Sequence, residues 1–296
     1  MKKHAYLLIV HNEFYLLQQL VGVLDDERND IYIHVDKKVK DFDFESIKRL
    51  VRKSQIFFVK RIRVSWGGDS MVKCEYVLLK EAFARGYQYY HLLSGVDFPI
   101  KSQEYIHNFF DQNKGTSYLH ITKDSSGNFD TTTQRNTEYR FFQNLIGRNE
   151  KPSNFLFRLE RRNIKLQRRL GINRLKSCPL KMYKGSQWFS ITHELAKEIL
   201  QQEGFVKKYF YKSYCPDELF VETIAMNSSI KNKILNNYMR HIDWKRGQPY
   251  IFQLKDFNEL IESDALFARK FSCATEDGKE LVARLKEYVS CDSREH

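Results

Sequence analysis

Short apolar runs alternate with segments of helical periodicity from residue 5 to residue 93, and this order constrains the fold more than any other feature of the chain. The apolar runs, which predict strands, cover residues 5–10, 31–36, 55–59 and 89–93. The segments with helical spacing cover residues 16–24, 44–51 and 71–85. A strand–helix alternation of this kind is typical of an α/β protein that opens with a parallel sheet.

The rest of the 296-residue chain continues without a linker, an internal repeat or a low-complexity segment. Strands are predicted at residues 182–191 and 250–252, helices at 193–202 and 255–263, and a polar loop facing the site or a partner at 123–150. Apolar residues make up 42% of the chain, which is enough for a large core. We therefore predict one domain over residues 1–296, in which residues 1–120 bind a nucleotide and residues 121–296 complete the site.

The formal net charge of +12 predicts an anionic partner. A nucleotide, a nucleic acid and an anionic membrane surface all satisfy this prediction. The basic residues are dispersed and no DNA- or RNA-binding motif occurs, so the nucleic acid is the least favoured of the three. Residues 158–169 are basic within an amphipathic segment, which predicts either a solvated helix face or a peripheral membrane contact.

The cysteines favour a reducing compartment. All five are widely spaced without a Cys-x-x-Cys pair, so neither a zinc site nor a disulfide framework is indicated. The apolar run at residues 5–10 is too short for a signal sequence or a membrane span. We therefore expect a cytoplasmic protein, with peripheral attachment to the inner face of the cell membrane as an alternative.

Residues with polar or aromatic side chains follow the predicted strands of the first half, namely His11, Asp36, Trp66 and Asp97. In open α/β sheets, ligands bind outside the carboxyl ends of the strands. These side chains therefore predict a nucleotide site at one edge of the sheet. Turn closure by the aspartates and core packing of Trp66 are the alternative interpretations.

Two adjacent carboxylates follow a proline in the segment Pro216-Asp217-Glu218. Pro216 suits a first helical turn, and the positive end of a helix favours ionised acids. An ionised carboxylate in this position can act as a general base, whereas helix capping is the structural alternative.

The sequence offers no convincing metal site. The Asp41-Phe42-Asp43 pair lies in a charged stretch just before a predicted helix, so we interpret it as a helix cap. Asp97, the single acid at its strand end, is a poor anchor for a divalent metal. Without a metal, basic residues must neutralise a diphosphate, and Arg246, Arg269 and Lys270 are available for this role.

Seven short blocks resemble, in the same order, the core-2/I-branching β-1,6-N-acetylglucosaminyltransferases and the related peptide xylosyltransferases of glycosyltransferase family 14. The blocks are Val10-His11-Asn12, Ile33-His34-Val35-Asp36, Ser65-Trp66, residues 92–101 (LLSGVDFPIK), Gly185-Ser186 with Phe189, residues 214–218 (YCPDE) and residues 266–271 (LFARKF). Each block alone is a weak signal, whereas the shared order over nearly the whole chain is specific.

The resemblance implies a GT-A-type fold, with a Rossmann-like mixed sheet flanked by helices. It also implies a UDP-sugar donor, inversion at the anomeric carbon and no metal requirement. Glu218 would be the catalytic base, with Asp217 capping the helix or orienting Glu218. Lys270 and an upstream arginine would hold the diphosphate; Arg246 is our choice, with Lys245 and Arg240 as alternatives.

Further site residues follow from the same resemblance. His11 and Asp36 would lie near the uridine or ribose. Gly185 and Ser186 are expected on the acceptor side, together with Trp188 as a sugar-stacking platform or a core residue.

The substrates are less closely defined. N-acetylglucosamine is the expected donor sugar, with UDP-xylose, UDP-galactose and UDP-glucose as alternative donors. The acceptor is a glycan, a glycolipid or a glycoprotein. The chain lacks the membrane anchor and paired cysteines of the animal members, which favours a bacterial member. The rival interpretations are a catalytically silent sugar-binding relative and a nucleic-acid-binding protein.

Overall fold

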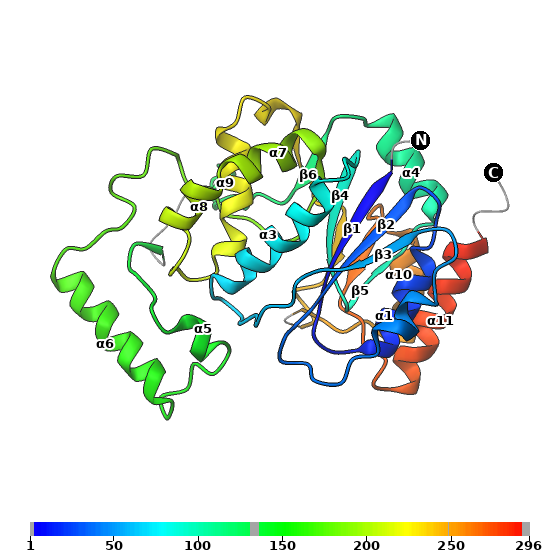
Figure 1. Ribbon diagram of the computed structural model, residues 1–296, viewed down its shortest axis with the longest axis horizontal. Coiled ribbons are helices and arrows are strands. Elements are labelled where there is room, and N and C mark those ends of the chain that lie inside the picture. The colour runs from blue at the N-terminus through cyan, green and yellow to red at the C-terminus, as the bar shows by residue number, and fades with distance from the viewer. Residues whose placement is uncertain (1–2, 131–135, 248, 292–296) are drawn as a thin grey trace.

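The computed structural model describes residues 3–130, 136–247 and 249–291 (Figure 1). Its strands are β1 (His4–Val10), β2 (Asn29–Val35), β3 (Gln55–Phe58), β4 (Tyr89–Ser94), β5 (Asp97–Pro99), β6 (Ser117–Leu119), β7 (Ser190–Thr192), β8 (Ile234–Asn236), β9 (Arg240–Ile242) and β10 (Phe267–Arg269). Its helices are α1 (Phe14–Val23), α2 (Phe44–Lys48), α3 (Ser70–Phe83), α4 (Gln103–Gln112), α5 (Gln143–Ile146), α6 (Phe155–Arg169), α7 (His193–Gln201), α8 (Glu203–Tyr209), α9 (Phe220–Asn227), α10 (Phe257–Glu262) and α11 (Glu276–Cys291). Short 3-10 turns are η2 (Pro216–Glu218), η3 (Lys231–Lys233) and η4 (Leu254–Asp256).

The main sheet has seven strands in the order β3-β2-β1-β4-β7-β6-β8. Strands β1 to β4 are parallel, β7 runs antiparallel to β4 and β6, and β8 is parallel to β6. A second sheet has the order β5-β10-β9. The prediction of a Rossmann-like mixed sheet is therefore confirmed.

Alternate residues of the central strands enter two separate cores, because successive side chains point to opposite faces of a sheet. On β1, Tyr6, Leu8 and Val10 pack in the core that includes α1 and α11. Ala5, Leu7 and Ile9 pack in the core that includes α3, α7 and α9. Figure 1 shows these helices in layers on either side of the sheet. Burial on both faces explains why the strands read as continuous apolar runs.

The predicted strand at residues 182–191 is mostly wrong, because only Ser190–Thr192 form β7. The backbone just before β7 forms hydrogen bonds to loops and turns, and not the regular hydrogen bonds of a paired strand. Gly185 N donates to Glu218 O at 2.8 Å, and Ser186 N donates to His120 O at 3.2 Å. The segment is thus an irregular connection that links β6 to the turn η2.

Two further expectations need correction. Residues 250–252 form no strand, because Tyr250 N bonds to Asp243 O and Phe252 N bonds to Lys270 O in a loop. Pro216 does not start an α-helix. It starts η2, which is separated from α9 by Leu219, whose φ of −136° breaks the helical path.

The predicted cap at Asp43 is confirmed, since its side chain accepts a hydrogen bond from Ser46 N at 3.0 Å. Within the predicted loop at residues 123–150, the described part is largely irregular apart from α5, and the Thr131-Thr132-Thr133 run lies outside the described residues.

Candidate functional site

The carboxyl ends of β1, β2 and β4 lie side by side. Asp36 N donates to Val10 O at 2.8 Å, and Gly95 N donates to Ile9 O at 3.0 Å. These bonds carry the strand pairing into the loops that follow. The parallel sheet therefore brings the loops of His11, Asp36 and Asp97 to one edge.

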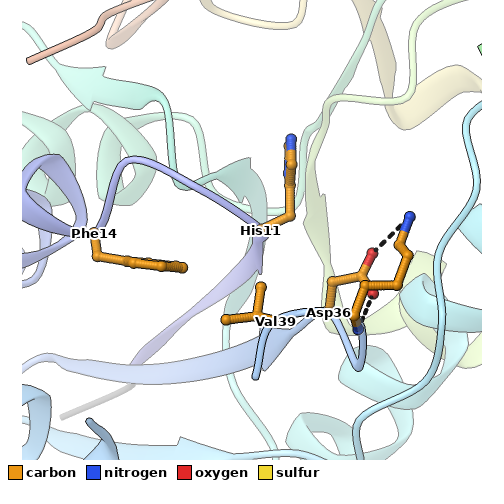
Figure 2. Close-up of a pocket in the computed structure, with 5 residues that line it drawn as sticks. His11, Phe14, Asp36 and Val39 are labelled. Atoms are coloured by element: carbon orange, nitrogen blue, oxygen red, sulfur yellow. Dashed lines mark hydrogen bonds and ion pairs between the residues drawn. The ribbon is translucent and has the colours of Figure 1, made fainter. Parts of the chain in front are cut away.

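A pocket of about 340 Å³ opens at this edge. His11 and Phe14 line it from the loop after β1, and Asp36, Lys38 and Val39 line it from the loop after β2 (Figure 2). Asp36 is buried, accepts a hydrogen bond from Lys38 N at 2.8 Å and pairs with Lys38 Nζ at 3.4 Å. Asp36 thus shapes its own loop and holds Lys38 at the pocket.

His11 lies among charged groups. Desolvation lowers the pKa of its imidazole. Asp36 opposes this shift, whereas Arg148, Lys38 and Lys270 lower the pKa further. The pocket that His11 lines therefore lies within electrostatic reach of three cations, which favours a ligand with negative charge.

Lys270 and Arg269 extend this positive region. Burial lowers the pKa of the Lys270 ammonium, and the charges of Arg269 and Arg148 lower it further, while Glu13 and Asp97 oppose the shift only in part. Among the described residues, Lys270 has no ion pair. A partly desolvated cation near two others is unfavourable without an anion, so this arrangement suits a phosphate.

Asp97 holds Arg269 in place. Its Oδ1 accepts hydrogen bonds from Arg269 Nη1 at 2.6 Å and Ser94 Oγ at 2.8 Å, and its Oδ2 accepts one from Ser94 N. The Arg269 guanidinium stacks over the Trp188 ring at 4.4 Å. Asp97 and Trp188 are both buried, so each orients Arg269 from within the protein.

Glu218 is half-buried at the end of η2. The turn follows Cys215, whose φ of 46° lies in the left-handed region, and Cys215 N donates to Gly67 O at 2.8 Å. Asp217 is buried beside Glu218. The sequence thus places both acids on a tight turn fixed by the glycine-bearing loop after Trp66.

Gly185 holds the other side of this turn through its hydrogen bond to Glu218 O. A Cβ on Gly185 would lie 1.9 Å from His120 O, so only glycine fits. Three residues later, Trp188 contacts Arg269. The predicted acceptor segment, with Ser186 bonded to His120 O, therefore joins the Glu218 turn to the cations.

Trp66 closes the arrangement. The residue is 40% exposed. Its ring lies 5.9 Å from the Tyr214 ring in an edge-on geometry and has the Arg148 guanidinium 5.9 Å above it. Gln143 on α5 donates to Trp66 O at 3.4 Å. Trp66 is thus partly exposed beside Arg148, and Gln143 holds its backbone.

Two of the three upstream basic residues already have partners within the protein. Arg246 pairs with Asp243, Asp256 and Glu259, which raises its pKa. The alternative Arg240 is a core residue, donating to Phe189 O and Ser190 Oγ. Lys245 is exposed on the loop beside Arg246. Arg246 also lies over the Tyr250 ring at 4.4 Å, and Lys270 N donates to Tyr250 O at 3.3 Å, so Tyr250 connects the two cations. The assignment of Arg246 to the diphosphate stays a prediction.

Two buried acids beneath Glu218 escape sequence reasoning. Burial raises the pKa of Glu75 well above its usual range, and Asp217 and Glu222 raise it further. Gln187 Nε2 donates to Glu75 Oε1 at 3.0 Å. Burial likewise raises the pKa of Glu222, with Glu218 and Asp217 adding to the rise. The sequence offers a signal only for Glu222, which is an acid within the apolar run that follows Glu218.

Lys38 and Arg148 were also missed. Lys38 lies two residues after Asp36, and a tight turn brings residues at this spacing together. The sequence therefore contains enough information to predict that Lys38 lies beside Asp36. Arg148 lies far in sequence from Trp66 and His11, and no local pattern distinguishes it from the other basic residues.

Among the described residues, no group of three or more His, Cys, Asp or Glu side chains is arranged to hold a metal ion. Within the same part of the chain, no helix has both the length and the apolar character needed to cross a bilayer.

Known proteins of similar sequence are glycosyltransferases by name. Xylosyltransferase 2 of Rattus norvegicus is 22% identical over 295 residues, covering 90% of this chain and 32% of its own length. The beta-1,3-galactosyl-O-glycosyl-glycoprotein beta-1,6-N-acetylglucosaminyltransferase of Homo sapiens is 22% identical over 302 residues, covering 90% of this chain and 65% of its own. The chain thus spans about a third of the xylosyltransferases that it matches.

Solved structures show a distant likeness. TarS of S. aureus has a TM-score of 0.42 at 14% identity, covering 98% of this chain and 40% of that chain. Mouse xyloside xylosyltransferase 1 has a TM-score of 0.38 at 11% identity, covering 93% of this chain and 99% of that chain. The sequence profile of the Core-2/I-Branching enzymes matches residues 4–260, which is most of the chain. The protein therefore belongs to the Core-2/I-Branching enzyme family.

Proposed function

We propose that this protein is an inverting glycosyltransferase that moves a sugar from a UDP-sugar to a hydroxyl of a glycan or glycoconjugate acceptor. The family membership supports the reaction class. The observation that carries the site assignment is a pair of contacts on either side of the Glu218 turn. On one side, Gly185 bonds to Glu218 O and leads to Trp188, which lies against Arg269. On the other side, Tyr214 lies edge-on to Trp66, which has Arg148 above its ring. A carboxylate and a cluster of cations thus border one region.

In the proposed reaction, Glu218 takes the proton of the acceptor hydroxyl as that oxygen attacks C1 of the donor sugar. The bond between C1 and the diphosphate oxygen breaks from the opposite side, so the anomeric configuration inverts and UDP leaves. Glu218 is suited to this role because it is half-buried on a turn whose backbone is fixed at both sides.

Negative charge develops on the departing UDP. The charges of Arg269 and Arg148 act on Lys270, and those of Lys270 and Arg148 act on His11 in the pocket. Fixed cations of this kind stabilise such charge. We therefore propose a reaction without a metal requirement. The uridine would occupy the pocket of about 340 Å³, with Asp36 and His11 at its wall.

N-acetylglucosamine is our first choice of donor sugar, because one of the named relatives transfers it. Xylose is the second choice for the same reason, with UDP-galactose and UDP-glucose as further alternatives. Pocket contacts to one hydroxyl or acetamido group separate these donors. Thermal stabilisation by each UDP-sugar in turn would identify the donor.

The decisive test is Glu218→Gln, which keeps the shape of the side chain but removes the base. We expect the rate of sugar transfer to fall by about two to four orders of magnitude, since general-base catalysis contributes roughly that much. Glu287→Gln, an exposed acid on α11, is the matched control and should retain full activity. Unchanged transfer by Glu218→Gln, with both variants folded, would refute the assignment.

A further inference from the structure

Helix α6 is built the opposite way round from an ordinary surface helix. Its buried face carries Glu160 and Gln167, which are 1% and 5% exposed, together with Ile164. Its outward face carries Phe155, Leu159, Leu166 and Leu170, which are 66%, 36%, 55% and 66% exposed. These four side chains, spaced by four, seven and four residues, form one line along the helix, here called the α6 stripe.

Hydrogen bonds hold the helix in this orientation. Gln167 accepts from Tyr139 N at 2.8 Å and donates to Tyr139 O at 2.9 Å. Glu160 accepts from Phe142 N at 3.3 Å. Rotating the α6 stripe inward would break these bonds and leave buried polar groups unsatisfied, which is costly. The outward exposure of the stripe is therefore a fixed feature of the fold.

Cations flank the α6 stripe. Arg158, Arg162, Lys165 and Arg169 recur every three or four residues, so they share one side of the helix, and all four are exposed. Within the described part of the chain, none of the four forms an ion pair. The helix thus presents an apolar line beside a cationic row, and Figure 1 shows α6 at the end of the molecule away from α11.

We propose that α6 binds the surface of an anionic lipid bilayer, with the α6 stripe among the acyl chains and the cationic row against the headgroups. Helices that lie in the membrane interface combine these two features. Long Lys and Arg side chains beside an apolar line reach headgroups while their stems stay in contact with the lipid.

The charge distinguishes this occupant from others. A second copy of α6 packed antiparallel would bring the two cationic rows together, which is repulsive, and one packed parallel would leave both rows without an anion. A nucleic acid would neutralise the row but would leave the four apolar side chains against phosphates and water. An anionic bilayer satisfies both halves of the surface at once.

The contact would also hold the candidate site near the lipid. Residues Phe142 and Gln143 join α6 to the site, since Phe142 bonds to Glu160 and Gln143 bonds to Trp66 O. Asn144 on α5 adds a bond to Asp69 at 2.7 Å. A membrane-bound α6 is therefore fixed to the loop that contains Trp66.

Co-sedimentation of the full-length protein with vesicles tests the proposal. The vesicles are phosphatidylcholine alone or phosphatidylcholine with phosphatidylglycerol. We expect binding to the anionic vesicles only. Phe155→Ser with Leu166→Ser and Leu170→Ser should lower the partition coefficient about tenfold or more, and so should glutamine at the four cationic positions. Leu50→Ser with Leu235→Ser, which changes exposed leucines elsewhere, is the control and should bind as the wild type does.

Circular dichroism and melting curves verify that each variant is folded. Anionic vesicle binding that survives the serine substitutions would overturn the proposal, as would equal binding to neutral vesicles. Sedimentation of the protein without vesicles tests whether a second copy of the chain covers the α6 stripe instead. A dimer that the serine substitutions convert to a monomer, without vesicle binding by either form, would show that a second copy covers the α6 stripe and would also overturn the proposal.

Discussion

Glu222 is a carboxylic acid enclosed in the protein interior four residues after the proposed base. It is 0% exposed, and burial raises the pKa of its carboxyl well above the usual value of 4.5. The charges of Glu218 and Asp217 raise that pKa further, while the backbone N–H groups of Glu222 and Ser186 oppose the rise only in part. Glu75 on α3 has a pKa raised by the same causes. We therefore expect both buried acids to be protonated at neutral pH.

This protonation makes stability depend on pH in a definite direction. Between the ordinary carboxyl pKa and the raised one, the native state keeps a proton that the unfolded chain has lost, so stability falls as the pH rises. Glu222→Gln resembles the protonated acid but cannot titrate. From about pH 5 to about pH 8, its free energy of unfolding relative to the wild type should therefore rise, by up to about 1.4 kcal/mol for each pH unit over which the native wild type keeps its extra proton. Urea unfolding at both pH values measures this.

The control for that comparison is again Glu287→Gln, whose exposed carboxylate should give the same difference from the wild type at both pH values. A Glu222→Gln difference that stays constant with pH would mean that Glu222 is already ionised in the native protein.

At the scale of single residues, the sequence favours Glu218 because the turn is local. Pro216, Asp217 and Glu218 are contiguous, and the proline fixes where the acids begin. Glu75 and Glu222 are different, because a glutamate within a helix ordinarily faces solvent. Their burial follows only from the packing of α3, α9 and η2, which no local pattern contains.

At the scale of elements, the connection from Gly185 to Trp188 joins the two sides of the candidate site. Gly185 N bonds to the Glu218 turn, and Gln187 bonds to Glu75. Trp188 lies against Arg269. An irregular segment of four residues therefore sets the position of the proposed base relative to the cations, and its close approach to His120 O depends on glycine.

Gly185→Ala tests this dependence. The added Cβ would meet His120 O at 1.9 Å, so the backbone must shift, and we expect a loss of about 1–3 kcal/mol in the free energy of unfolding. Sugar transfer should fall more than stability alone explains, because Glu218 O loses its donor. Gly204→Ala on α8 is the matched control: no atom lies within 4 Å of its Cβ, and helix propensity predicts a gain of up to about 1 kcal/mol. Equal behaviour of the two variants in denaturant would contradict the close-contact argument.

The strands that are buried on both faces are the ones that the sequence predicts best. Strand β1 was expected at residues 5–10 and covers His4–Val10, because an apolar run buried on both faces has one interpretation. The sequence predicts a strand over residues 182–191, whereas β7 is only Ser190–Thr192, because a segment that pairs with loop backbone has the same composition as one that pairs with a strand. Pairing partners distant in sequence decide between the two.

At the scale of the whole molecule, the candidate site draws on loops from both ends of the chain. His11 and Asp36 come from the first two strands, Trp66 and Arg148 from the middle, and Lys270 from beyond β10. The order of the strands predicts that His11 and Asp36 meet, because these residues follow β1 and β2, which are parallel neighbours in the sheet. The approach of Lys270 depends on the second sheet, where β10 pairs with β5, and the sequence contains no sign of that pairing.

Because Lys38, Arg148 and Lys270 act on the pocket that His11 lines, the protein should bind UDP without a metal. In EDTA, UDP at about a hundredfold excess over its Kd should raise Tm by about 5 °C, since binding to the native state alone contributes about 2.7 kcal/mol. Lys270→Met should weaken binding about tenfold to hundredfold, because it removes a charge-assisted bond to phosphate. Lys197→Met, an exposed position on α7, should leave the shift intact, since α7 starts at the opposite edge of the sheet. A rise in Tm that UDP causes only after Mn²⁺ is added would mean that a metal, and not these cations, holds the diphosphate. A full rise in Tm for Lys270→Met would mean that the diphosphate binds away from Lys270.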